Sequence, residues 1–150
     1  MNLVEELNIV QDEITQLKKD NLKKKNDIEE LLLNYERQID SLLNDFISVV
    51  DAYEKVEIKI KDMDLPEDEI IQKVVKRMMQ PKKTALSVLS KHGVSQIDII
   101  GKSLNEDLCT VTETEPDSEK ENDIVLSIEK NGYKRGERLI RRAEVIIVRN

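Results

Sequence analysis

The sequence is poor in the residues that build large cores and reactive sites. Its 150 residues include one cysteine, one histidine, one phenylalanine and no tryptophan. A single cysteine excludes a disulfide within the chain and any metal site that needs two cysteines. Charged residues make up 37% of the chain and aromatic residues 3%, which leaves little material for a large globular core. We therefore expect an elongated or oligomeric protein. The single cysteine is consistent with a reducing compartment, and we expect the cytoplasm.

Residue patterns that support catalysis, cofactor binding or membrane insertion are missing as well. The histidine, His92, precedes a glycine, where an imidazole can bond the last carbonyls of a helix. Cys109 lies in a strand-like run and is expected to be a small buried hydrophobe. No glycine pattern resembles a phosphate-binding loop, and no apolar run approaches the roughly 18 residues of a membrane span. We expect no enzyme active site, no cofactor, no metal ion and no membrane contact.

Apolar residues recur from Leu3 to Ile60 in steps of three and four. Because glycine and proline are absent before Pro66, this spacing predicts one helix of about 60 residues, roughly 90 Å long. The apolar stripe is typical of a coiled-coil seam, which a single helix cannot bury. We therefore predict a homodimer. Its interface residues in the long helix are Leu17, Ile28, Leu32, Tyr35, Ile39, Leu42, Phe46 and Val49.

The predicted seam is interrupted in its first half. Continuing the same steps through the gap places Asn21 and Lys24 on the seam, and two successive steps of four residues form a stutter that loosens the supercoil. Polar residues at seam positions also lower stability. We expect the segment between Leu17 and Ile28 to be the first part of the dimer to melt.

A second helical region follows "MDLPEDE". Pro66 ends the long helix and can itself lie in the first turn of a new one. Helical spacing returns in "IIQKVVKRMM" and "TALSVLSKHG", which are separated by Pro81. This pattern predicts two short helices, or one kinked helix, with Gly93 as the C-cap. In a dimer, two copies would form a four-helix bundle.

After Gly93 the sequence changes to short β-branched runs, which predict strands. They read "VSQIDII", "LCTVT", "DIVLSIE" and "AEVIIV", and the acidic segment "ETEPDSEKEND" between the second and third predicts a solvated hairpin loop. The fold class is therefore α+β, with helices and strands segregated along the chain. We expect three regions, namely a coiled-coil helix over 1–62, short bundle helices over 63–93 and a β module over 94–150.

The end of the sequence is basic, although the chain as a whole is acidic. From Gly132 onward there are six Lys or Arg and two Glu, a charge of about +4, so the other residues carry about −11 of the total of −7. A basic cluster raises the possibility of nucleic-acid binding. However, Tyr133 is the only aromatic residue there for base stacking, and most of the surface would repel a polyanion. The pattern favours a protein partner with an acidic face.

This basic segment, "GYKRGERLIRRAEVIIV", resembles the carboxy-terminal signature of the GrpE family of nucleotide exchange factors. The matching positions are Gly132, Tyr133, Arg138, Ile140, Arg141, Ala143, Val145 and Val148. Three earlier segments are similar to family elements in the same order, namely "DNLKKK" around Asn21, "DFISVVDAYEKV" with Asp51 and Lys55, and "LSKHGVSQID". The chain is identified as a divergent member, because it departs from the family pattern at Arg77, Asn105, Glu106, Cys109 and Arg142.

The resemblance implies a homodimeric co-chaperone that binds the ATPase domain of a DnaK-type chaperone and accelerates ADP release, in protein folding and the stress response. It implies that the chaperone is contacted by Lys55 at the end of the long helix and by Leu104, Glu129, Arg138 and Arg141 of the β module. It also implies a stalk that unfolds reversibly on heating. The alternative is a dimeric coiled-coil scaffold without exchange activity.

Overall fold

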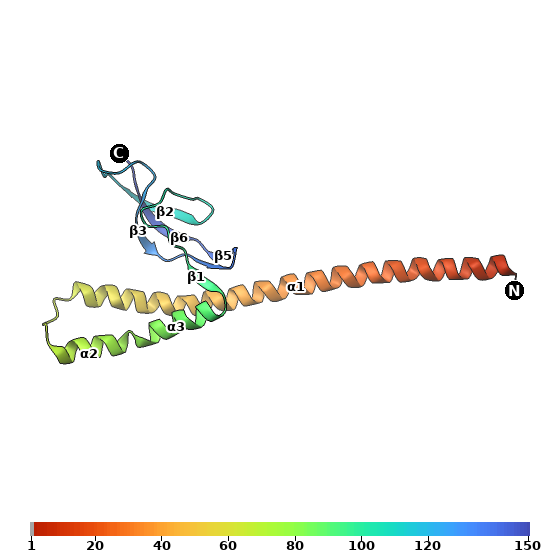
Figure 1. Ribbon diagram of the computed structural model, residues 1–150, viewed down its shortest axis with the longest axis horizontal. Coiled ribbons are helices and arrows are strands. Elements are labelled where there is room, and N and C mark those ends of the chain that lie inside the picture. The colour runs from red at the N-terminus through yellow and green to blue at the C-terminus, as the bar shows by residue number, and fades with distance from the viewer. Residues whose placement is uncertain (1) are drawn as a thin grey trace. The chain divides into compact units, whose positions relative to one another are not determined.

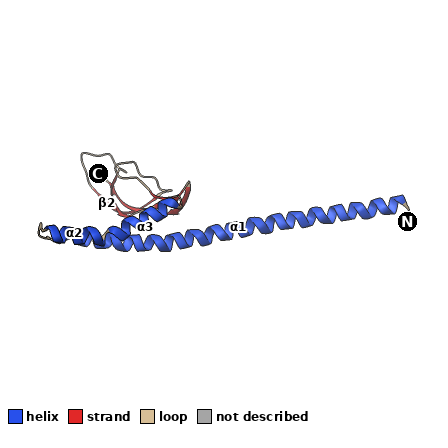
Figure 2. Cartoon of the chain, turned by 60° about the horizontal axis from the view of Figure 1, so that its bottom comes forward, coloured by secondary structure: helices blue, strands red, loops and turns tan. Residues whose placement is uncertain are grey.

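A computed structural model describes residues 2–150 of the chain. Within these residues a long helix, two short helices and six strands follow one another in that order (Figure 1). Helices and strands occupy separate parts of the fold (Figure 2), so the predicted α+β class is confirmed. The chain divides into two compact units, of which the first ends at Ser41 and the second is Leu42–Asn150.

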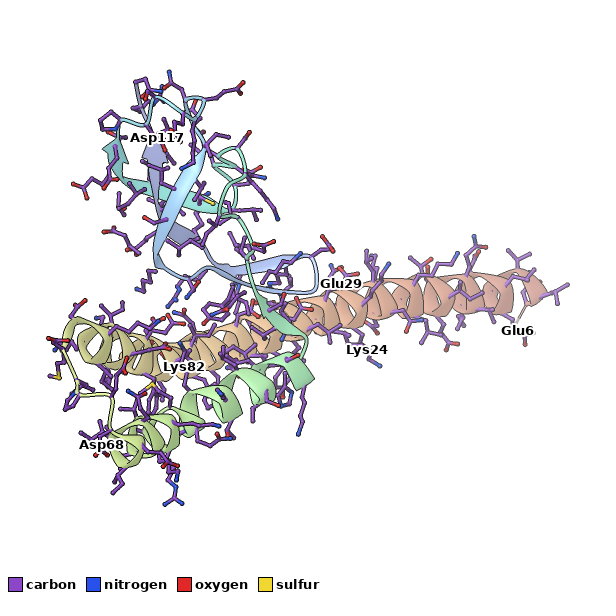
Figure 3. The ribbon with its side chains drawn as sticks, turned by 60° about the vertical axis from the view of Figure 1, so that its left-hand side comes forward. Glu6, Lys24, Glu29, Asp68, Lys82 and Asp117 are labelled. Carbon is purple, nitrogen blue, oxygen red and sulfur yellow. The ribbon has the colours of Figure 1, made fainter. Side chains whose placement is uncertain are left out.

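The long helix, α1, covers Leu3–Asp62 without a break, as the sequence predicts. Acidic residues occupy its first turn and basic residues its last turn, where each sign of charge is favoured by the helix dipole. In the first unit, α1 is the only element, and its side chains project from the helix on all sides (Figure 3). Every side chain of the predicted seam in this unit is therefore exposed in the single chain, including Leu17, Ile28 and Tyr35.

Helix α2 covers Glu69–Met78 and begins at an aspartate cap. The Asp68 carboxylate accepts hydrogen bonds from the backbone N–H groups of Ile70 at 2.7 Å and Ile71 at 3.2 Å, and Figure 3 labels this residue at the start of the helix. The prediction that Pro66 could lie in the first turn was wrong. An aspartate satisfies free N–H groups at a helix start, so the helix begins after Asp68 and leaves the proline in the preceding turn.

Helix α3 covers Gln80–Lys91, directly after α2. Pro81 lies in its first turn, where a missing backbone N–H leaves no hydrogen bond unmade. The helix ends at Lys91 with His92 as its C-cap, and Gly93 follows with a φ of 76°. This left-handed conformation favours glycine. The chain thus has two short helices, and the predicted C-cap is one residue off, because His92 is the C-cap and Gly93 follows it.

Three short strands form the first sheet, in which all pairs are antiparallel. Its order is β1–β4–β5, and the strands are β1 (Val94–Gln96), β4 (Tyr133–Arg135) and β5 (Arg138–Arg141). Strands β4 and β5 form a hairpin whose tip is tied to the end of α3, because Gly136 N–H donates to the carbonyl of Gly93 at 3.1 Å. The basic segment therefore begins as a hairpin of this sheet.

The second sheet has the order β2–β6–β3. Its strands are β2 (Cys109–Glu115), β3 (Val125–Lys130) and β6 (Ala143–Val148). Strand β6 is parallel to β2 and antiparallel to β3. The predicted hairpin between β2 and β3 is therefore wrong. The last strand, which buries alternate apolar residues and both residues at its end, lies between them.

The acidic segment between β2 and β3 is held by the last residue of the sequence. Asn150 donates from Nδ2 to the carbonyls of Asp117 at 3.0 Å and Lys120 at 3.1 Å, and its Oδ1 accepts from the Asp117 N–H at 2.9 Å. The hydrogen bond from Lys120 lowers the pKa of Asp117. This loop is thus ordered by hydrogen bonds, although most of its residues are exposed as predicted.

Two apolar clusters hold the second unit together. The first fills the β module, and its buried members are Ile97, Ile99, Cys109, Val125, Ala143, Val145 and Ile147. Cys109 is 4% exposed there, as predicted for a small buried hydrophobe, and burial raises the pKa of its thiol. The second cluster joins the helices to the first sheet. Its buried members are Ile47, Val50, Ala85, Leu89, Val94 and Tyr133.

The substitution Gly132→Ala should destabilise the protein by about 2 kcal/mol or more. An added Cβ would lie 2.5 Å from the backbone nitrogen of Ala143 and 2.8 Å from Cδ1 of Ile97, and a backbone atom cannot move aside as a flexible side chain can. Gly136→Ala is the matched control, since only its left-handed φ of 59° opposes the change. Urea unfolding should show the larger loss for Gly132→Ala, and equal losses would contradict the close packing.

Candidate partner-binding site

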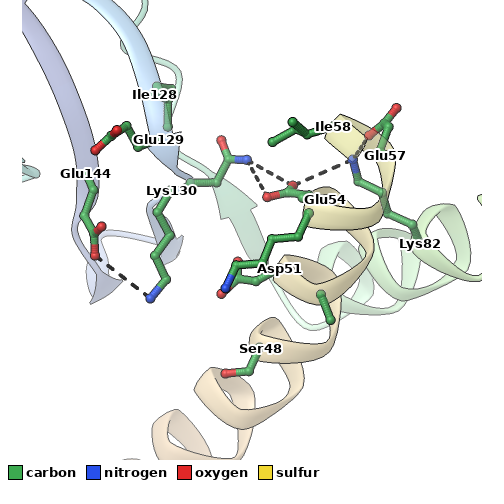
Figure 4. Close-up of a pocket in the computed structure, with 13 residues that line it drawn as sticks. Ser48, Asp51, Glu54, Glu57, Ile58, Lys82, Ile128, Glu129, Lys130 and Glu144 are labelled. Carbon is green, nitrogen blue, oxygen red and sulfur yellow. Dashed lines mark hydrogen bonds and ion pairs between the residues drawn. The ribbon is translucent and has the colours of Figure 1, made fainter. Parts of the chain in front are cut away.

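A groove of about 710 Å³ lies between the second half of α1 and the β module (Figure 4). On α1 it is lined by residues three or four positions apart, which share one face of a helix. Strand β3, the residue after it and Glu144 of β6 form the opposite side. The charged and amide residues of its lining are Asp51, Glu54, Lys55 and Glu57 of α1, Lys82 of α3, and Glu129, Lys130, Asn131 and Glu144 of the β module.

A chain of polar contacts crosses this groove. Asn131 donates from Nδ2 to both carboxylate oxygens of Glu54 at 3.0 Å. Lys82 lies 3.8 Å from Glu54 and donates to Glu57 at 2.6 Å, and Figure 4 shows these contacts side by side. The hydrogen bond from Lys82 lowers the pKa of Glu57 against the opposing effect of partial burial. The contacts connect α3, α1 and the β module.

A second polar contact lies one turn earlier on α1. Arg141 donates from Nη1 and Nη2 to the two oxygens of Asp51 at 2.6 and 2.8 Å. The two side chains are 15% and 14% exposed. Burial opposes the charge on Arg141, but the hydrogen bond and the charge of Asp51 outweigh it, so the pKa of the guanidinium is raised. This fork-shaped pairing is the strongest geometry for an arginine and a carboxylate.

The structure brings two of the predicted partner-binding residues together. Lys55 and Glu129 are both exposed and line the groove from α1 and from β3. Leu104 is half-buried against the core of the β module, and Arg138 is exposed at the start of β5. Arg141 donates hydrogen bonds to Asp51 within the same chain. Contact of these five residues with a partner stays a prediction.

The predicted dimer surface is apolar and open in the single chain. Leu42 is 69% and Val49 49% exposed, and Phe46 and Val49 line a groove that α1 forms with α3. A second groove, between the end of α1 and α2, is lined almost entirely by apolar side chains. They are Val56, Ile60, Met63, Leu65, Ile70, Ile71, Val74, Val75 and Met78, with Lys59 beside them.

The face of α1 that packs on the β module was not predicted from the sequence. Ile47 and Val50 are fully buried there, and Asp51 and Glu54 make the polar contacts described above. These four residues fall between the predicted seam positions, at spacings of three and four. The sequence signal for this second face is a stripe of apolar and then acidic residues that lies beside the predicted seam.

The described residues contain no group of three or more His, Cys, Asp or Glu side chains arranged to hold a metal ion. None of the helices within residues 2–150 carries an apolar stretch of the length that crossing a bilayer requires. The described residues also form one polar groove and two mostly apolar grooves.

Comparison with known proteins identifies the family. A family model described as GrpE matches residues 1–149, and the chain belongs to the GrpE family. It is 28% identical over 109 residues to "Protein GrpE" of Shewanella baltica (strain OS155), which covers 73% of this chain and 51% of that protein.

Two further relatives match a similar share of the chain. "Protein GrpE" of Parageobacillus thermoglucosidasius is 32% identical over 105 residues, covering 70% of this chain and 45% of the relative. "Protein GrpE" of Zymomonas mobilis is 32% identical over 101 residues, covering 67% and 52%. The chain thus spans about half the length of the curated relatives it matches. These identities fit the divergent membership that the sequence indicates.

Proposed function

We propose that this protein is a homodimeric nucleotide exchange factor that binds the ATPase domain of a DnaK-type chaperone and accelerates release of ADP. The match of residues 1–149 to the GrpE family carries the proposal. The order of elements, a long helix, two short helices and a β module, supports it. The proposed site of action is the cytoplasm, and the proposed role requires no catalytic residue and no cofactor of its own.

The proposed mechanism is thermodynamic linkage between two ligands of the chaperone. If the dimer binds the ATPase domain better when its nucleotide cleft is open, it shifts the domain toward that state. ADP favours the closed state, so the exchange factor and ADP must weaken each other's binding by the same factor. No chemical step is needed on this chain, because surface complementarity to the open state is sufficient.

The proposed dimer covers the exposed apolar surface of the helices. In the second unit this surface runs from Leu42 and Val49 on α1 to Ile70, Val74 and Met78 on α2, all exposed. Burial of apolar area contributes about 25 cal/mol per Å². Two copies of the short helices over 63–93 would form the proposed four-helix bundle, and the seam of the first unit would continue the interface as a coiled coil.

The proposed contact with the chaperone uses both α1 and the β module. Lys55 and Glu129, on opposite sides of the polar groove, offer charges of both signs to a partner. Arg138 offers a guanidinium from the hairpin, and Leu104 offers a half-buried apolar surface. Charges at the edge of such a contact steer association, whereas buried groups determine how long the complex lasts.

Calorimetric titration of a DnaK-type ATPase domain with this protein tests the proposal. Binding to the nucleotide-free domain should be tight, and saturating ADP should weaken it markedly. Equal affinity with and without ADP would contradict the linkage, although it would leave binding itself intact. Absence of binding in both titrations would favour the second candidate, a coiled-coil scaffold without exchange activity, which the exposed apolar residues along α1 also support.

Replacing Asn21 with Leu and Lys24 with Ile should raise the temperature of the first helical melting transition by about 5 °C or more. Helix α1 runs through both positions without a break, so their polar side chains weaken the proposed seam without ending the helix. Circular dichroism at 222 nm would follow the transition. If the seam acts as a thermal sensor, exchange activity should persist to higher temperature in this variant. An unchanged activity profile beside a raised melting temperature would exclude that role.

A further inference from the structure

Arg141 connects α1 and the β module at a single point. It lies at the end of β5, 90 positions along the sequence from its partner Asp51. Besides the paired bonds to Asp51, its Nε and Nη2 donate to the carbonyl of Asn131 at 3.1 and 2.6 Å. The guanidinium carbon also lies 5.3 Å from the centre of the Tyr133 ring. One side chain therefore holds a helix, the end of β5 and the connection between β3 and β4.

The contact of Asn131 with Glu54 adds a second point, about one helical turn away. The backbone carbonyl of Asn131 thus accepts a hydrogen bond from Arg141, and its side-chain amide donates to Glu54. Lys82 of α3 supports Glu54 from the far side. We call Asp51, Glu54, Asn131 and Arg141 the polar clasp.

The polar clasp differs in its physical role from the apolar cluster beside it. Burial of Ile47, Val50 and Tyr133 stabilises the contact between α1 and the first sheet. The hydrophobic effect is non-directional, so it does not fix the angle between them. Hydrogen bonds and paired charges are directional. A buried ion pair also adds little net stability, since the loss of hydration offsets its attraction. The clasp is therefore suited to fixing an angle between two parts that the apolar cluster already holds together.

We propose that the polar clasp sets the orientation of the β module on α1 and so places the partner-binding residues of both parts on one surface. Asp51 is one helical turn from Lys55, and Asn131 is two residues after Glu129. Fixing the clasp residues therefore fixes the two sides of the groove. Arg141 and Asp51 act in this account as positioning residues. The inference depends on the proposed exchange function only for its binding measurement.

Variants that remove the charges of Asp51 and Arg141, first singly and then together, distinguish an effect on orientation from an effect on stability. Asp51→Asn or Arg141→Met alone leaves one mostly buried charge without its partner, so each should lower the melting temperature. The double variant Asp51→Asn/Arg141→Met should recover most of that loss, because no unpaired charge remains. Arg149→Met is the matched control, since it removes a guanidinium from the exposed pair with Asp123 at 3.0 Å.

Distances between two spin labels then report the orientation itself. Cysteines would replace the exposed residues Asp62 at the end of α1 and Glu119 in the acidic loop, in a Cys109→Ala background. Mixing with an excess of unlabelled protein restricts the measurement to distances within one chain. The parent and Arg149→Met should give one narrow distribution. The double variant should give a broad or shifted distribution, even where its melting temperature matches the parent.

A parental distance distribution in the double variant would overturn the proposal. If that variant does not recover its melting temperature, Arg141→Lys takes its place, because lysine keeps the charge but cannot form the two-pronged contact. It too should broaden the distribution. Affinity for a DnaK-type ATPase domain should fall about tenfold in the same variants. If the parent itself does not bind, the exchange function fails, while the distance measurement still decides the role of the clasp.

Discussion

Val49→Glu should convert the protein from a dimer to a monomer. Val49 is 49% exposed in the single chain, so a glutamate there is solvated and compatible with a helix while the chain is alone. In the proposed dimer the same position is covered by the partner, and two carboxylates would be buried near each other. Burial of unpaired charges should weaken association by at least about 3 kcal/mol.

Sedimentation equilibrium would measure this loss directly. The parent should have twice the chain mass of 17.4 kDa and the variant the mass of one chain. Ser41→Glu is the matched control, since it adds the same charge to an exposed position of α1 that is not part of the predicted seam. A dimeric Val49→Glu variant, or a monomeric parent, would show that the exposed apolar surface is not the interface.

The largest expected effect on partner binding follows Arg138→Glu. Arg138 is exposed at the start of β5, in a hairpin that also carries Lys134 and Arg135. If its guanidinium meets an acidic group of the chaperone, reversal of the charge should weaken binding by about 2 kcal/mol or more, which is roughly thirtyfold. Titration of the ATPase domain with parent and variant would give this ratio.

Arg138 also has contacts within its own chain, so a loss of folding must be distinguished from a loss of contact. Circular dichroism does so, because a variant that melts with the parent but binds weakly has lost a contact with the partner. Early melting would indicate that Arg138 supports the hairpin instead. Arg149→Glu makes the same change on the same module, at a residue that is 57% exposed, and should leave binding nearly unchanged.

The helical part of the fold could be predicted because its signals are local. Spacing of apolar residues and the absence of glycine and proline predict α1, which ends at Asp62. Gly93 marks the end of α3 because the left-handed conformation there favours glycine. The start of α2 was missed by a few residues, since both a proline and an aspartate can open a helix and only the backbone geometry shows which one does.

The pairing of the strands could not be predicted from the same signals. Runs of β-branched residues indicate where strands lie but not which strands pair with each other. Neighbouring strands in sequence usually pair, yet β6 separates β2 from β3. The Asp51–Arg141 contact joins residues 90 positions apart. In the sequence Asp51 is one acidic residue among many on a helix, so nothing local distinguishes it from its solvated neighbours.

Release of a fluorescent ADP from a DnaK-type chaperone of the same cell, followed by stopped flow, tests the central claim most directly. The parent protein should accelerate release strongly, and the rate should saturate as its concentration rises. Val49→Glu and Arg138→Glu should each bring the rate back toward that of the chaperone alone, whereas Ser41→Glu and Arg149→Glu should act like the parent. If the parent leaves the rate unchanged with every DnaK-type chaperone of that cell, the protein is not an exchange factor.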